Sequence, residues 1–227
     1  IKTLNLSRNE FTEIPPCIFR LENLEVLDLS YNGLKSIPAD LKNLKNLKVL
    51  KLSKNQLTDL PDGLEKLVNL TELSLDNNKF EKFPVKVTKC PKLEELNLDA
   101  NGMSAISPEI AKMTTLKKLT LGKNNIATLP DEIGKIPNIE YLDLESNQLT
   151  DLPAAISGLT SLKTLELGKN KLIAIPEAIG KLTSLVSLNL SGNKCTKIPE
   201  SIGKFAELTS LDLSGNGIAL LPKEIGN

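Results

Sequence analysis

The chain has 227 residues and zero formal net charge, with 28 basic and 28 acidic residues, no His and no Trp. Without an imidazole, this segment excludes Ser-His-Asp and Cys-His nucleophiles, His-ligated metals and His-based pH switches. The zero net charge also argues against a mainly electrostatic nucleic-acid binder, which needs a basic surface to neutralise phosphates. No apolar run approaches the length that crosses a bilayer, and no signal-peptide pattern opens the chain.

Asn recurs every 23 residues along the whole chain, which indicates a repeat architecture. With Ile1 counted as slot 1, each unit follows the pattern L-x-x-L-x-L-x-x-N-x-L-x-x-L-P-x-x-I-x-x-L-x-x. The units are residues 1–23, 24–46, 47–69, 70–92, 93–115, 116–138, 139–161, 162–184, 185–207 and a partial unit, 208–227. The sequence therefore predicts one repeat domain over 1–227. Because neither core edge carries a polar cap, we expect this domain to be an excerpt of a longer protein.

Each unit begins with a short predicted strand. Slots 4 and 6 are Leu in nearly every unit and alternate with slots 3, 5 and 7, so the leucines are buried and the other three slots face solvent. Stacking the units pairs each strand with the next in a parallel sheet. We expect the Asn in slot 9 to end the strand and bond unpaired backbone groups, which makes this Asn ladder structural. Its members are Asn9, Asn32, Asn55, Asn78, Asn101, Asn124, Asn147, Asn170, Asn193 and Asn216.

The opposite side of each unit begins at Pro in slot 15 and ends near Lys in slot 20. Acidic residues after the Pro and a basic residue at the end suit the dipole of one short helical turn. The whole pattern resembles leucine-rich repeats, and the L-P-x-x-I-x-x-L that follows the Asn resembles the 23-residue Ras-group class. The resemblance implies an α/β right-handed solenoid, a horseshoe with a concave parallel β-sheet and short helical or 3-10 turns on its convex side. For function it implies a recognition surface and no particular chemistry.

The concave face, made of slots 3, 5 and 7, is strongly acidic. It carries nine acids and two lysines: Asp28, Glu72, Asp76, Glu95, Asp99, Asp143, Glu145, Glu166 and Asp212, with Lys51 and Lys118. Slot 8, where each strand ends, holds four basic residues and no acid, namely Arg8, Lys54, Lys123 and Lys169. We therefore expect an acidic strip bordered by a basic rim, which favours short-range complementarity to a partner over long-range steering.

Tyr141 in slot 3 is the single aromatic residue of the three concave slots, and aromatic residues often anchor protein interfaces. A second interpretation is that Tyr141 only stacks on the aliphatic stem of Lys118 in the neighbouring strand. The predicted partner-binding residues are Glu72, Asp76, Glu95, Asp99, Lys118, Tyr141, Asp143, Glu145 and Glu166. Slots 3, 5 and 7 of units eight to ten carry small or polar residues over which a partner could lie close.

Paired carboxylates in units four and five offer the remaining catalytic or metal-binding hypothesis. Glu72 and Glu95 in slot 3, like Asp76 and Asp99 in slot 7, should lie about 5 Å apart across the ladder. Such pairs could raise a pKa or collect Ca²⁺, but an open sheet offers no water-excluded pocket, so we predict no catalysis, no metal and no cofactor.

Two further features concern the core. Cys90 and Cys195 occupy apolar slots and Cys17 lies on an outer turn, so the sequence predicts free thiols and no disulfide framework. Units four and five exchange large residues for small ones around Phe80 and Phe83, which indicates either compensated packing or a local change of curvature.

Together these features predict a non-catalytic protein-protein interaction scaffold that binds a partner with a basic surface on the concave face. One alternative is the recognition module of a larger signalling enzyme, since similar repeats accompany GTPases, kinases, phosphatases, cyclases and ubiquitin ligase effectors. The other is a secreted or surface-bound bacterial or pathogen repeat protein. We expect a cytoplasmic monomer that binds no nucleic acid, with self-association through its uncapped ends as an alternative.

Overall fold

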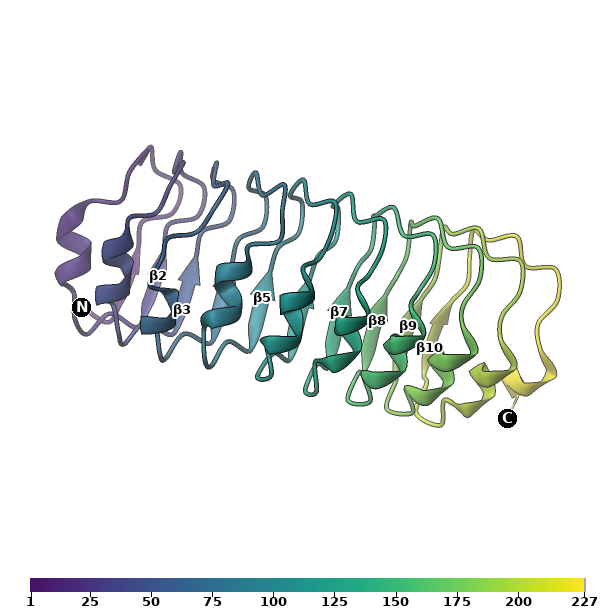
Figure 1. Ribbon diagram of the computed structural model, residues 1–227. Helices are drawn as coiled ribbons and strands as arrows, with labels where there is room; N and C mark the ends of the chain where they lie inside the picture. Colours follow the sequence, from purple (N-terminus) through teal and green to yellow (C-terminus); the bar gives the residue numbers. More distant parts are fainter. Residues whose placement is uncertain (227) are drawn as a thin grey trace.

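The computed structural model describes residues 1–226, so that Asn227, the last residue of the partial tenth unit, lies outside it. Ten three-residue strands form one open parallel sheet in chain order (Figure 1). The strands are β1 (Thr3–Asn5), β2 (Val26–Asp28), β3 (Val49–Lys51), β4 (Glu72–Ser74), β5 (Glu95–Asn97), β6 (Lys118–Thr120), β7 (Tyr141–Asp143), β8 (Thr164–Glu166), β9 (Ser187–Asn189) and β10 (Ser210–Asp212). Neighbouring strands pair residues 23 positions apart, as Leu73 with Leu96. The horseshoe solenoid is therefore confirmed.

A short 3-10 helix closes the convex side of every turn, opposite the sheet (Figure 1). These helices are η1 (Pro16–Arg20), η2 (Ala39–Asn43), η3 (Leu64–Lys66), η4 (Val85–Lys89), η5 (Pro108–Lys112), η6 (Asp131–Lys135), η7 (Ala154–Gly158), η8 (Glu177–Lys181), η9 (Glu200–Lys204) and η10 (Lys223–Gly226). Most begin directly after the Pro of slot 15, whose fixed φ suits a helix start. In η5 the Pro is replaced by Ser107, whose hydroxyl accepts a hydrogen bond from the Glu109 N–H at 3.2 Å.

The Asn ladder supplies backbone hydrogen bonds between successive turns. Asn147, only 3% exposed, donates from Nδ2 to the carbonyl oxygens of Leu121 at 2.9 Å and Leu144 at 3.0 Å. Its Oδ1 accepts the Ile126 N–H at 3.0 Å. One side chain thus satisfies buried groups in its own turn and in the preceding one, which would otherwise cost about 1–3 kcal/mol each.

Before each Asn, the residue in slot 8 turns the chain out of the strand with a positive φ. Eight of these residues are not glycine, with φ between 50° and 58°, and include Arg8, Tyr31, Lys54 and Lys123. Units nine and ten use Gly192 and Gly215 instead. This left-handed backbone directs the side chains of the basic rim away from the strand axis, so the rim lies beside the acidic strip.

The core is one continuous stack of leucines and isoleucines between the sheet and the 3-10 helices. Phe80, Phe83, Val87 and Cys90 of unit four are all buried, so large and small residues share one layer without leaving the core. Cys195 is buried and Cys17 is exposed, and all three cysteines are free, as the sequence predicted. The alternative that units four and five change the curvature stays a prediction, as does association through the ends.

Candidate functional site

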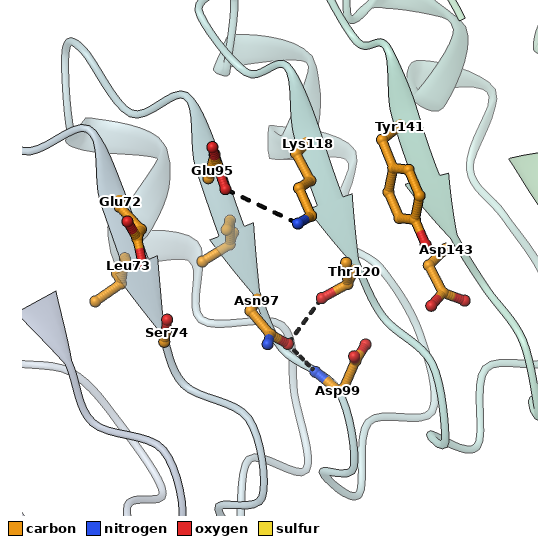
Figure 2. A pocket seen from close by; sticks show the side chains of 11 residues that line it. Glu72, Leu73, Ser74, Glu95, Asn97, Asp99, Lys118, Thr120, Tyr141 and Asp143 are labelled. Carbon is orange, nitrogen blue, oxygen red and sulfur yellow. Dashed lines mark hydrogen bonds and ion pairs between the residues drawn. The ribbon is translucent and has the colours of Figure 1, made fainter. Parts of the chain in front are cut away.

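A hollow of about 360 Å³ lies on the concave face, across the four strands β4 to β7 (Figure 2). Alternation along each strand buries the central Leu and turns its two neighbours outward, so the walls come from slots 3 and 5 of consecutive units. Six of the nine predicted partner-binding residues line the hollow: Glu72, Glu95, Asp99, Lys118, Tyr141 and Asp143. Their role in binding a partner stays a prediction.

One wall of the hollow is made of two glutamates in register. Glu72 pairs with Glu95 across β4 and β5, as predicted from their common slot. Each has a lysine nearby: Lys51 Nζ lies 3.8 Å from a Glu72 carboxylate oxygen, and Lys118 Nζ lies 4.0 Å from one of Glu95. These long, solvent-exposed contacts contribute little to stability and leave both carboxylates accessible.

Asp99 forms the floor of the hollow and is held by backbone groups. Its Oδ1 accepts the Gly122 N–H at 2.7 Å, and its own N–H donates to Asn97 Oδ1 at 3.0 Å. Thr120 Oγ1 also donates to Asn97 Oδ1, at 2.7 Å, which fixes the Asn amide between the two strands (Figure 2). Burial, followed by the charge of Asp143, raises the pKa of Asp99 to about 6, against the opposing effect of the Gly122 hydrogen bond.

Asp143 and Tyr141 form the opposite wall. Asp143 Oδ1 accepts the Glu145 N–H at 2.8 Å, and burial raises the pKa of its carboxyl. Burial also raises the pKa of the Tyr141 phenol, and the charges of Asp143, Glu166 and Asp99 add to the effect. Burial is the largest cause of all three raised pKa values, and nearby negative charges add to it.

Gly122 lies close to both Asp99 and Asp143. It occupies slot 7, as Gly168 does in unit eight, and a Cβ atom there would lie 3.3 Å from the Glu145 carbonyl oxygen and 3.4 Å from Oδ1 of both Asp99 and Asp143. The two carboxylates therefore approach the same buried glycine, where a side chain would crowd them. Counting charges in the sequence does not reveal that this glycine lies between two acids.

Lys118 contacts Tyr141 as well as Glu95. Its Nζ lies 5.5 Å from the centroid of the Tyr141 ring, within cation–π distance. The second interpretation of Tyr141, stacking on its neighbour, therefore describes a real contact. It leaves the ring half-buried, with one edge turned toward the hollow (Figure 2).

Three predicted residues lie outside the hollow. Asp76 is turned toward its neighbours, accepting hydrogen bonds from Ser53 Oγ, from Asn77 Nδ2 at 2.8 Å and from Asn97 Nδ2 at 3.2 Å. Glu145 forms an ion pair with Lys169 of the basic rim at 2.6 Å. Glu166 pairs in register with Asp143 and extends the acidic strip to β8.

This face has several polar and charged features beyond those predicted from the sequence. Ser74, Asn97 and Thr120 line the hollow but carry no charge, so counting acids could not select them. Slot 2, at the strand entry, was not read as part of the face, although it carries a row of alternating Lys and Glu that pair across strands. Tyr31 is a second aromatic residue beside this face, but it lies in slot 8, outside the concave slots 3, 5 and 7.

Within residues 1–226, no cluster of three or more His, Cys, Asp or Glu side chains has the geometry to hold a metal ion. Of the four carboxylates considered for Ca²⁺, that of Asp76 accepts hydrogen bonds from Ser53 and Asn97, and that of Asp99 accepts one from Gly122. None of the short helices over the same residues is long and apolar enough to cross a membrane.

The architecture and the exposed concave sheet define a class of protein, the open repeat solenoid that presents one face for recognition. The chain belongs to the leucine-rich repeat family. A family model described as a leucine-rich repeat region matches residues 1–109 and 101–191, and a second leucine-rich repeat model matches residues 184–205 and 207–227. Membership of the 23-residue Ras-group class stays a prediction.

Two solved structures illustrate the relationship. A leucine-rich repeat protein of Leptospira interrogans is 42% identical with a TM-score of 0.92, over 96% of this chain and 56% of that one. The PEPR1–AtPEP1 structure is 30% identical with a TM-score of 0.75, over 99% of this chain and 36% of that one. The chain thus spans little more than half the length of the first protein and about a third of the second. No sequence among curated proteins matches the chain.

Proposed function

We propose that this leucine-rich repeat domain binds a protein partner on its concave face, with basic side chains of the partner entering the hollow between Asp99 and Asp143. Leucine-rich repeat regions commonly act as protein-interaction modules, and one neighbouring structure is that of PEPR1–AtPEP1. The single observation that carries the proposal is that two partly buried carboxylates, those of Asp99 and Asp143, line the same hollow.

Electrostatics favours a cationic guest. Among residues 1–226, neither Asp99 nor Asp143 has a basic nitrogen within ion-pair distance, and Lys118 points toward Glu95 and Tyr141. Burial raises the pKa of both aspartates, and at Asp99 repulsion by the charge of Asp143 adds to the effect. A Lys or Arg side chain would relieve this repulsion and bring its own aliphatic stem against Tyr141, as cations and aromatic rings favour.

A titration with a defined probe tests the proposal. The probe is a fluorescein-labelled peptide of alternating Gly and Lys, and the control peptide replaces every Lys by Glu. We expect Asp99→Asn combined with Asp143→Asn to weaken binding of the Lys peptide at least about ten-fold, since each pair of charges contributes about 1 kcal/mol or more. The control is Glu140→Gln, which removes an acid from the strand-entry row that does not line the hollow.

The proposal fails if the double variant, its fold verified by circular dichroism, binds the Lys peptide as tightly as the wild type. It also fails if Glu140→Gln weakens binding by the same factor, because the effect would then follow net charge and not the hollow. No catalytic step is proposed for these residues.

A specific observation favours one alternative for the cellular setting. The Leptospira interrogans neighbour is the more similar of the two reported structures, and it is bacterial. We therefore propose a bacterial repeat protein, secreted or surface-bound, as the second candidate beside a cytoplasmic scaffold or a signalling-enzyme module. Surface labelling of intact cells with a membrane-impermeant reagent distinguishes the first from the other two.

A further inference from the structure

A second cluster of functional groups lies on the basic rim, in units one to three. Arg8, Tyr31 and Lys54 occupy slot 8 of consecutive units, and all three side chains are exposed. The Arg8 guanidinium carbon lies 4.4 Å from the centroid of the Tyr31 ring, and Lys54 Nζ lies 4.7 Å from the same centroid. We call this group the cationic stack.

The backbone sets the spacing of the cationic stack. Arg8 donates its N–H to the Ser30 carbonyl at 2.9 Å, and Tyr31 donates to the Ser53 carbonyl at 2.8 Å, so each residue is tied to the next turn. The ring therefore lies between side chains that come from the turn before and the turn after. Tyr31 also adopts φ 57°, a left-handed conformation that is costly for a bulky residue unless its surroundings hold it there.

Both cations of the stack keep their donors free. Within the described residues, neither Arg8 nor Lys54 has a carboxylate within ion-pair distance, whereas Lys169 in the same slot is paired with Glu145. Contact with a ring satisfies the face of a guanidinium and leaves its N–H groups available to acceptors. The ring also restricts both long side chains before any partner arrives, which lowers the entropy cost of binding an anion.

We propose that the cationic stack is a docking site for an acidic segment of the protein partner, whose carboxylates accept hydrogen bonds from Arg8 and Lys54 beside the Tyr31 ring. The choice of a protein segment follows from charge: the acidic strip next to the stack, including Asp28 and Asp76, repels an extended polyanion but tolerates a short run of Asp or Glu. A guanidinium and a carboxylate also form the strongest paired hydrogen bonds.

The two sites together define the direction in which the partner lies along the sheet, an inference that rests on the function proposed above. With strands about 4.8 Å apart, the stack at β2 lies roughly 20 Å from the hollow at β4 to β7. An extended peptide covers that distance with about six residues. The expected partner therefore carries an acidic segment and a basic segment about six residues apart, which fixes its orientation along the sheet.

The chain contains only two tyrosines, and each site holds one. Incorporation of 3-fluorotyrosine therefore gives two ¹⁹F resonances, which Tyr31→Phe and Tyr141→Phe assign. We expect an acetylated peptide of alternating Gly and Glu to shift the Tyr31 resonance and leave Tyr141 unchanged. The peptide of alternating Gly and Lys should shift Tyr141 alone, so the two proposals fail separately.

Substitutions test the cations directly. Arg8→Gln combined with Lys54→Gln should weaken binding of the Glu peptide about five- to ten-fold, as two exposed charge pairs contribute. The matched control is Lys123→Gln, which removes an exposed lysine from the same slot of unit six, where no aromatic residue lies beside it. That variant should bind the Glu peptide like the wild type.

Three results would overturn the proposal. The Glu peptide could leave the Tyr31 resonance in place at concentrations that saturate the Lys peptide at Tyr141. The double variant could bind the Glu peptide as tightly as Lys123→Gln does. A single-stranded DNA oligonucleotide could shift Tyr31 at lower concentration than the peptide, which would assign the stack to a polyanion and not to a protein segment.

Discussion

Two groups of charged residues lie on the same sheet, and only one of them is neutralised within the domain. At the strand entry, slot 2 alternates in sign, so that each acid lies beside a lysine of the next strand. The distances between charged atoms are 2.8 Å for Lys2–Glu25, 2.5 Å for Glu25–Lys48, 2.8 Å for Glu94–Lys117 and 2.6 Å for Glu140–Lys163. Hydrogen bonds from Lys2 and Lys48 lower the pKa of Glu25 to about 2. We call this row the paired ladder.

In the hollow, acidic side chains lie near other acidic side chains. Asp99 follows β5, Asp143 and Glu166 pair in register in β7 and β8, and burial followed by the charge of Asp143 raises the pKa of Asp99 to about 6. An acid that lies beside a lysine is neutralised within the domain. An acid that lies near another acid remains available to a partner. The sign of the neighbouring charges therefore distinguishes charges that stabilise the solenoid from charges that are available for binding.

The largest expected effect comes from giving the hollow the sign pattern of the paired ladder. Asp143→Lys places a cation between Asp99 and Glu166, in the position that we assign to the partner's basic group. Binding of the Lys peptide should fall about thirty-fold or more, since an attractive contact becomes repulsive. Calorimetric titration measures the loss. Unchanged affinity would show that the hollow does not hold the peptide.

The next effect is a pH dependence confined to the hollow. Because the pKa of Asp99 is about 6, this carboxylate is protonated at pH 5 and charged at pH 7.5. The Lys peptide should therefore bind up to about ten-fold more weakly at pH 5 than at pH 7.5. Asp99→Asn should remove most of this difference. The pKa of Glu25 is about 2, so this acid of the paired ladder stays charged over the same range. A pH profile that survives in Asp99→Asn would contradict the assignment.

Stability should move in the opposite direction to binding. The folded-state pKa of Asp99 lies above its ordinary value of 3.8, so the fold disfavours the charged form and gains stability as the pH falls from about 6 toward 4. Asp99→Asn removes the charge and keeps an acceptor for the Gly122 N–H. We expect this variant to be more stable than the wild type by about 1 kcal/mol at pH 7.5 in urea denaturation. A loss of stability would show that the charge supports the fold.

The smallest effect is expected in the paired ladder. Glu25→Gln removes the acid between Lys2 and Lys48, at the edge of the sheet where solvent screens the charges. The melting temperature should fall by no more than about 2 °C, and the decrease should vanish in high salt. Differential scanning calorimetry at two salt concentrations measures it. An altered affinity for the Lys peptide would mean that the ladder also takes part in binding.

The fold could be predicted because each unit repeats the same pattern of residues. The alternation of slots 3 to 7 specifies the strand, Asn in slot 9 specifies its end, and Pro in slot 15 specifies the start of the outer turn. A single unit cannot bury its leucines alone, so the repeat also determines the stacking.

The site could be predicted only in part, because slots determine the face on which a residue lies and not the direction of its side chain. Asp76 and Glu145, both in slot 7, are drawn away by Ser53 and Lys169 of neighbouring units. Gly122 lies against Oδ1 of both Asp99 and Asp143, which counting charges does not register. Tyr31 lies outside slots 3, 5 and 7. It occupies slot 8, where the left-handed backbone turns the side chain to a position beside the concave face.

One measurement tests the central claim, that the unneutralised acids around Tyr141 form the binding site. Fluorotyrosine-labelled protein is titrated with the alternating Gly and Lys peptide, with Asp99→Asn plus Asp143→Asn as the comparison. The account predicts that the Tyr141 resonance shifts to saturation in the wild type, that Tyr31 stays in place, and that the double variant needs at least about ten-fold more peptide. A shift of Tyr31 in place of Tyr141, or identical titrations of the two proteins, would contradict it.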